Sequence, residues 1–192
     1  MNCATWNVRG LNKRSHQKEA LHFVDSNHLS FVGFMETKVK VQNMSKVVNR
    51  IKRNLSWVSK HADHYNGRII IGWDAAIWTV SVLNSSPQHV TCRALFKENN
   101  SSFVISFIYA FNDGCDRVPR WNFISSYSVG ESWCLAGDFN TVLSISEILG
   151  VVSTGHPRCK LLKTVWLMLV SLVFEPLGIL LPGQTEGRMT WC

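Results

Sequence analysis

The sequence predicts an α/β fold in which a run of antiparallel strands is bracketed by helices. An apolar content of 46% in 192 residues suits one folded domain with a real core. Helical periodicity appears before residue 56, whereas three strand-like segments follow one another closely at 77–83, 89–96 and 102–109. Short connections of this kind favour antiparallel neighbours, because parallel strands need long crossovers.

The first 73 residues predict alternating strands and helices. The spacing of Met44, Val47, Val48, Ile51 and Leu55 is i, i+3, i+4, i+7, i+11, which is typical of an amphipathic helix. A tight turn at Tyr65-Asn66-Gly67 separates the last two strands of this part. The other expected elements are a strand at 3–8, a helix at 15–27 and strands at 29–35, 55–59 and 68–73.

The rest of the chain predicts a helix begun by Asp116 and running through Ile124, and then a buried strand that opens the segment 133–140. Residues 1–160 form the expected domain, and 161–192 a divergent apolar tail. Charged and helix-breaking residues interrupt the apolar run 161–181, so no uncharged stretch within it is long enough to cross a bilayer. We expect a buried helix at 158–172 instead.

Polar side chains recur where the predicted strands end. Asn7 and Glu36 each follow an apolar strand, and Tyr109 ends another. Asp138 and Asn140 stand two residues apart, so on an extended segment both side chains point to the same side. Each residue also has a structural explanation: an Asx turn for the Asp138/Asn140 pair, an exposed loop charge for Glu36 and a rim aromatic for Tyr109.

The charge of the chain is positive and uneven. The formal net charge is +7, and residues 1–60 hold eleven Lys and Arg against three acids. A basic face favours nucleic acid, although a solvated surface gives the same pattern. The six cysteines form no C-x-x-C pair, which disfavours zinc and favours a reducing compartment. The N-terminus lacks a signal-peptide pattern, so we expect an intracellular protein that is not secreted.

Four motifs carry a resemblance to a known family. Trp6-Asn7-Val8-Arg9-Gly10-Leu11-Asn12, Met35-Glu36-Thr37-Lys38, Ile108-Tyr109 and Gly137-Asp138-Phe139-Asn140 resemble the endonuclease/exonuclease/phosphatase superfamily. The residues of these motifs are most similar to those of the endonuclease domain of plant LINE-type (non-LTR) retrotransposons. The resemblance implies a four-layer α-β-β-α sandwich of two mainly antiparallel sheets.

The resemblance also implies a metal-assisted reaction on phosphodiester bonds. Glu36, assisted by Asn7, would hold Mg²⁺, with Mn²⁺ as the alternative ion. Asp138 would orient or deprotonate the attacking water, while Asn140 and Tyr109 would hold the phosphate. The basic residues expected to contact nucleic acid are Arg9, Lys13, Arg14 and Lys38. The expected partner is DNA, with RNA as an alternative, and the expected state is a monomer without a defined protein partner.

Two features depart from the family pattern. Arg9 stands where many repair-type relatives carry an acid, a difference shared with retrotransposon members. The family's final Ser-Asp-His motif does not follow residue 140: Asp63-His64 lies too early, and His156 stands in the wrong context. We therefore expect a truncated or frame-shifted copy whose last strands are missing.

Three functions remain open from the sequence. The resemblance implies a Mg²⁺-dependent, DNA-nicking retrotransposon endonuclease that would act in the nucleus and that the missing motif would impair. The alternative, which the missing acid-base pair favours, is a non-catalytic remnant that binds nucleic acid weakly through its basic face. Phosphatase or RNA 3′-exonuclease activity is a third reaction of the same superfamily, compatible with the shared metal centre although the motif residues argue against it.

Overall fold

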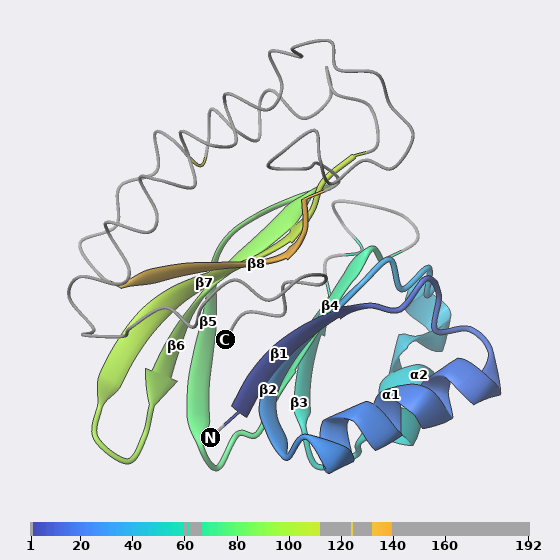
Figure 1. Ribbon diagram of the computed structural model, residues 1–192, viewed down its shortest axis with the longest axis horizontal. Coiled ribbons are helices and arrows are strands. Elements are labelled where there is room, and N and C mark those ends of the chain that lie inside the picture. Colours follow the sequence, from blue (N-terminus) through green and yellow to red (C-terminus); the bar gives the residue numbers. More distant parts are fainter. Residues whose placement is uncertain (1, 60, 62–66, 112–123, 125–131, 140–192) are drawn as a thin grey trace, which may run out of the picture.

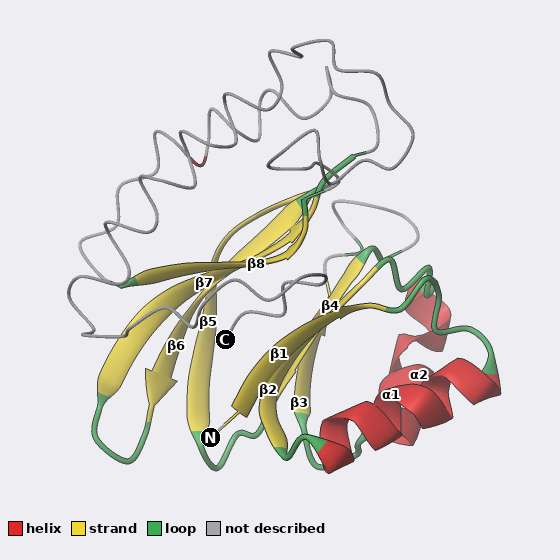
Figure 2. Ribbon diagram, in the orientation of Figure 1, coloured by secondary structure: helices red, strands yellow, loops and turns green. Residues whose placement is uncertain are grey.

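Two four-stranded sheets and two α-helices form the part of the chain that a computed structural model describes, namely residues 2–59, 61, 67–111, 124 and 132–139 (Figures 1 and 2). The first sheet has the order β1 (Asn2–Asn7), β2 (Leu29–Met35), β4 (Ile69–Trp73), β3 (Ser56–Ser59). The second has the order β5 (Trp78–Ser86), β6 (His89–Phe96), β7 (Ser101–Tyr109), β8 (Trp133–Asp138). The helices are α1 (Arg14–Ser26) and α2 (Met44–Ile51), and a 3-10 turn at Val41–Asn43 precedes α2.

Both sheets are mainly antiparallel, as predicted. Antiparallel pairing joins β2 to β4 and β4 to β3 in the first sheet, and β5, β6 and β7 in the second. Each sheet also contains one parallel pair, β1 with β2 and β7 with β8. In the first sheet, α1 makes the crossover that a parallel pair requires.

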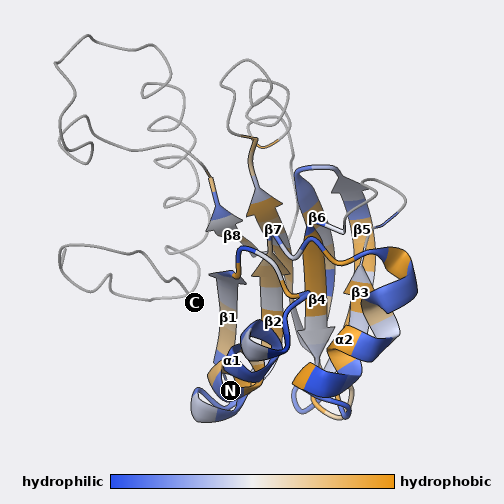
Figure 3. Cartoon of the chain, turned by 90° about the vertical axis from the view of Figure 1, so that its right-hand side faces the viewer, coloured by the Kyte–Doolittle hydropathy of each residue, from blue (hydrophilic) through white to orange (hydrophobic). Residues whose placement is uncertain are grey.

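The described layers are helices, first sheet and second sheet, with one apolar core on each side of the first sheet. Figure 3 shows α1 and α2 lying over the first sheet. Successive side chains of β2 point to opposite faces, so Val32 and Phe34 pack in the core beneath the helices, while Phe31 and Met35 pack against the second sheet. Every residue of β2 is buried, which explains its unbroken apolar sequence.

A glycine in β2 sets how closely the two sheets approach. A Cβ added at Gly33 would lie 2.2 Å from Cδ1 of Phe107, so the Phe107 ring occupies the space that any larger residue would need. Phe107 also makes an edge-to-face contact with Phe31, with ring centroids 5.6 Å apart. The aromatic packing between the sheets therefore depends on a residue without a side chain.

The bounds predicted from the sequence agree with those of most of these elements to within one or two residues. The α2 helix is shorter than its apolar pattern, because Lys52 is extended and ends the helix, yet Leu55 still packs into the core beneath the helices. Strand β5 continues to Ser86, past the predicted end at residue 83. The helices predicted at 116–124 and 158–172, the tail 161–192 and the turn residues Tyr65 and Asn66 lie outside the described residues, except Ile124. No described helix is long and apolar enough to cross a membrane.

Candidate active site at the strand ends

Five strands bring polar residues to one end of the sandwich. The β-sheet register places Asn7 beside Met35, Met35 beside Ile69, and Tyr109 beside Asp138. The ends of β1, β2, β7 and β8 and the beginning of β4 therefore lie together (Figure 1). Convergence of this kind is how α/β proteins commonly assemble ligand sites.

A hydrogen bond links the two sheets at this end. The Asn7 amide donates through Nδ2 to Oδ2 of Asp138 at 2.6 Å, across 131 positions of sequence. The Asn7 carbonyl Oδ1 accepts the Arg9 backbone N–H at 3.3 Å, and the Asp138 backbone carbonyl accepts the Ala110 N–H at 2.9 Å. The first two bonds orient the Asn7 side chain against the Asp138 carboxylate, and the third joins the backbone of β8 to the residue after β7.

Glu36 is held in a tight turn after β2. Glu36 and Lys38 both have positive φ, 55° in each case, which non-glycine residues rarely adopt. Thr37 between them is fully buried, and its N–H and hydroxyl donate to the carbonyls of Arg68 and Gly67. These bonds hold the turn in its strained conformation, a feature that clusters at functional sites.

An ion pair occupies the Glu36 carboxylate. Lys38 Nζ lies 2.7 Å from Glu36 Oε1, with the lysine side chain 58% exposed and the glutamate side chain 20% exposed. Lys38, predicted to contact nucleic acid, thus also neutralises a predicted metal ligand. The Lys38 ammonium shows that a cation reaches this carboxylate oxygen.

Tyr109 lies within electrostatic reach of both acids. Burial raises the pKa of its phenol above the ordinary value of 10.0, the Glu36 and Asp138 charges raise it further, and the Arg68 and Lys38 charges oppose them. The phenol is consequently a neutral hydrogen-bond donor at physiological pH. The hydroxyl, the two carboxylates and the two cations form one electrostatic group.

The raised pKa predicts the result of an ultraviolet titration. The wild type and a Tyr109→Phe variant are titrated side by side, and the difference between their tyrosinate absorbances reports Tyr109. This difference should develop only above pH 10. Because the folded pKa exceeds the unfolded pKa of about 10, the Tyr109 contribution to the free energy of unfolding is fully present below pH 10 and is lost as pH rises through the folded pKa. A tyrosinate at position 109 that forms below pH 10 would contradict this.

The remaining predicted residues lie around this centre. Arg9, Lys13 and Arg14 are exposed along the β1–α1 connection, and Asn12 Nδ2 donates to the Lys38 carbonyl at 2.7 Å, which ties this connection to the Glu36 turn. Asn140 lies outside the described residues. The structure thus brings Asn7, Glu36, Tyr109 and Asp138 together, while the roles of all five residues stay predictions.

Arg68 is the site residue that the sequence reasoning missed. It directly precedes β4, and its Cζ lies 5.5 Å from the Tyr109 ring centroid and 4.7 Å from that of Phe111. Only polar residues that follow strands drew attention in the sequence. An arginine before a strand gives no comparable signal, and its partners stand about forty positions later.

The donor set fits a hard divalent cation. Carboxylate oxygens of Glu36 and Asp138 and the amide oxygen of Asn7 are the oxygen ligands that Mg²⁺ prefers, and Mg²⁺ needs only one or two carboxylates. Within the described ranges, no three His, Cys, Asp or Glu side chains come together as in a closed metal cage. The fit therefore rests on the chemistry of these oxygen donors.

Solved structures share this fold. The endonuclease domain of TRAS1, a telomere-specific non-LTR retrotransposon, matches with a TM-score of 0.63 at 13% identity, over 87% of this chain and 71% of that one. An AP endonuclease from Leishmania major has a TM-score of 0.57 at 14% identity, over 88% and 65%. A mannosyl-6-phosphatase of Bacteroides thetaiotaomicron has a TM-score of 0.56 at 10% identity, over 84% and 69%.

The fold is thus that of the endonuclease/exonuclease/phosphatase sandwich, a class that includes a retrotransposon endonuclease domain. At 10–14% identity the likeness establishes the fold alone. No model of a known protein family matches the sequence, and no curated protein matches it.

Proposed function

We propose that this chain binds DNA at the candidate active site and hydrolyses a phosphodiester bond there with the help of Mg²⁺. The observation that carries the proposal is the 2.6 Å bond from Asn7 to Asp138, which places the end of β1 against the end of β8 beside Glu36 and Tyr109. Oxygen donors and a neutral phenol thus lie at the same end of the sandwich as the exposed basic residues. Mn²⁺ suits the same oxygen ligands.

Each side chain has a chemical role in this proposal. Glu36 and Asn7 would hold the ion, because the Asn7 carbonyl has a second lone pair besides the one engaged by Arg9. The bound ion would offset negative charge on the phosphoryl oxygens. The Asn7 amide fixes the orientation of the Asp138 carboxylate, which would orient and deprotonate water. Tyr109 would donate to a phosphate oxygen, and Asn140 shares this role in the resemblance.

DNA is favoured as the substrate by charge and by fold. Arg9, Lys13, Arg14 and Lys38 are exposed next to the candidate site, where they would contact flanking phosphates. The matched TRAS1 domain is an endonuclease of a non-LTR retrotransposon, which supports a nicking activity on DNA and a nuclear place of action for this chain.

The nicking rate of these 192 residues should be low. By resemblance, an Asp-His pair contacts the reacting phosphate, and the sequence contains no Ser-Asp-His after residue 140. The same observation favours a second function, namely binding of nucleic acid without hydrolysis. The first experiment below separates the two.

We expect the folded chain to convert supercoiled plasmid into nicked circles with Mg²⁺ and not with EDTA. A Glu36→Gln variant should lose about 100-fold or more of this activity, because a metal ligand accounts for several kcal/mol of transition-state stabilisation. Gel quantification of nicked circles over time gives the rates.

The matched control is Glu98→Gln, an identical change of an exposed residue between β6 and β7, at the opposite end of the sandwich. It should nick at the wild-type rate. Plasmid binding without Mg²⁺-dependent nicking by a folded sample would reject hydrolysis and support the second function.

A further inference from the structure

We propose that Arg68 binds a backbone phosphate of the nucleic acid at the candidate active site, with its guanidinium held in place by the rings of Tyr109 and Phe111. This inference rests on the proposed function and adds a phosphate contact to it. The contact comes from the first sheet, where Arg68 directly precedes β4, and reaches Tyr109 at the end of β7 and Phe111 just after it.

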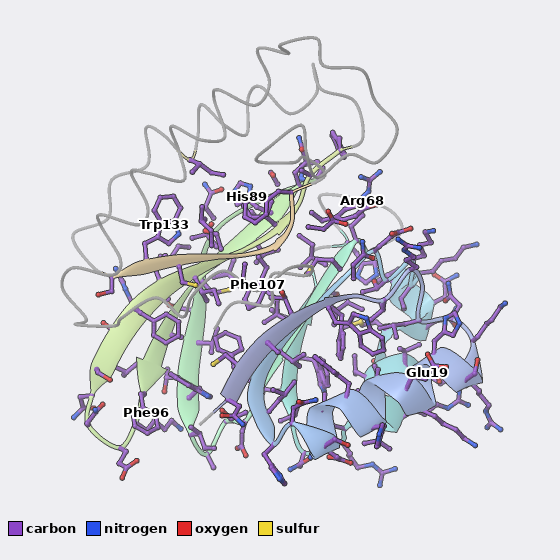
Figure 4. The ribbon with its side chains drawn as sticks, viewed as in Figure 1. Glu19, Arg68, His89, Phe96, Phe107 and Trp133 are labelled. Atoms are coloured by element: carbon purple, nitrogen blue, oxygen red, sulfur yellow. The ribbon has the colours of Figure 1, made fainter. Side chains whose placement is uncertain are left out.

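The backbone around Arg68 belongs to the site. Its carbonyl accepts the Thr37 N–H at 3.2 Å, within the turn that carries Glu36. Ile69, the next residue, pairs with Met35, the residue before Glu36. Figure 4 shows Arg68 at the end of the first sheet where β4 begins. Arg68 is therefore fixed to the Glu36 turn at the level of the main chain.

The aromatic contacts determine where the charge of Arg68 lies. Its Cζ is 4.7 Å from the Phe111 centroid and 5.5 Å from the Tyr109 centroid, within the range of cation–π attraction. A guanidinium is planar, and contact with rings through its face leaves N–H groups at its edge to donate. That edge is suited to two parallel hydrogen bonds with phosphate oxygens.

The electrostatic surroundings favour an anion next to Arg68. Both ion pairs among the described residues use lysines, Lys38 with Glu36 and Lys52 with Asp25, so no described carboxylate pairs with Arg68. Arg68 is half-buried, and its guanidinium is permanently charged. The Arg68 charge acts on the Tyr109 phenol, the group proposed to donate to the reacting phosphate. A phosphate bound by that phenol would therefore also lie within reach of the Arg68 charge.

A purely structural role predicts a different behaviour. If Arg68 only covers the two rings, a variant with an uncharged side chain that covers them equally well should bind DNA with the salt dependence of the wild type. If Arg68 contacts a phosphate, its loss removes one counterion-release event, which flattens the salt dependence by about 0.9 in log–log slope for duplex DNA. The slope therefore distinguishes a phosphate contact from packing.

The test measures binding of a fluorescent DNA duplex by anisotropy, in EDTA so that no hydrolysis occurs, over a series of salt concentrations. Arg68→Met keeps a flexible apolar chain over the rings, Arg68→Gln removes the charge, and Arg68→Lys retains it. Lys97→Gln is the control, since Lys97 follows β6 at the opposite end of the sandwich.

In Arg68→Met and Arg68→Gln, we expect the slope of log affinity against log salt concentration to become shallower by about 0.9. Both variants should bind DNA about eightfold more weakly at about 0.1 M salt. Arg68→Lys and Lys97→Gln should keep the wild-type slope. An unchanged slope in a folded Arg68→Met variant would overturn the inference and leave the proposed function standing. A wild-type chain that binds no DNA would overturn both.

Discussion

Replacing Asp138 with asparagine is expected to reduce Mg²⁺-dependent nicking by about 10²- to 10⁴-fold without loss of the fold, which is the usual contribution of a general base. Asparagine has the same shape, and its carbonyl oxygen still accepts the hydrogen bond that Asn7 donates. What disappears is the charge and the ability to take a proton from water. Plasmid nicking and thermal unfolding, measured on the same sample, test both halves of this expectation.

Asp74→Asn provides the matched control for Asp138→Asn. Asp74 follows β4 at the opposite end of the sandwich, and its Oδ1 accepts the Ala76 N–H at 2.8 Å in a local turn. The change is chemically identical, so any general effect of lost negative charge appears in both variants. If the Asp138→Asn variant nicks plasmid at the wild-type rate, Asp138 takes no part in the reaction.

The described site also suggests how it behaves before substrate binds. Lys38 pairs with the Glu36 carboxylate that the proposed ion requires, so the ion must displace or share that contact. The Lys38 side chain is largely exposed, whereas the Glu36 side chain is only 20% exposed. Lys38 could therefore move toward a DNA phosphate when the incoming ion takes its place at Glu36.

Strand positions followed from local sequence patterns. The bounds of β2 and β6 match their predicted ranges because apolar, β-branched and aromatic residues fill both segments between polar connections. Patterns also located Asn7, Glu36, Tyr109 and Asp138 at strand ends. The α2 helix was overestimated, because Leu55 keeps the helical spacing although the chain is already extended at Lys52.

Two side-chain contacts of the site were beyond those patterns, one between distant segments and one within a turn. Nothing in the sequence near Arg68 indicates the rings of Tyr109 and Phe111, and nothing near Glu36 indicates that Lys38 folds back onto it. Both contacts depend on how the strands and turns pack in three dimensions. The family resemblance supplied the order of site residues, but the positive φ angles of Glu36 and Lys38 have no signature in residue type.

The glycine before Asp138 connects the fold to the site. A Cβ added at Gly137 would lie 2.0 Å from the Ile108 carbonyl oxygen and 2.8 Å from its nitrogen, and Gly137 has a φ of 139°. Backbone atoms of β7 cannot yield as a side-chain tip does. Gly137→Ala should therefore lower the free energy of unfolding by about 3–5 kcal/mol, from overpacking and backbone strain together. Denaturant unfolding measures this loss.

Gly10→Ala separates the two causes. Gly10 also has a positive φ, 110°, but its added Cβ would meet only Lys38 Cδ at 3.9 Å, an ordinary contact. The Gly10→Ala variant has backbone strain without a steric clash, so its free energy of unfolding should fall by about 1–3 kcal/mol. Because the clash at Gly137 pushes β8 away from β7, Asp138 would move relative to Tyr109, and nicking by the folded fraction should fall as well. Equal losses of stability in the two variants would show that backbone conformation, and not the close approach of β8 to β7, makes glycine necessary before Asp138.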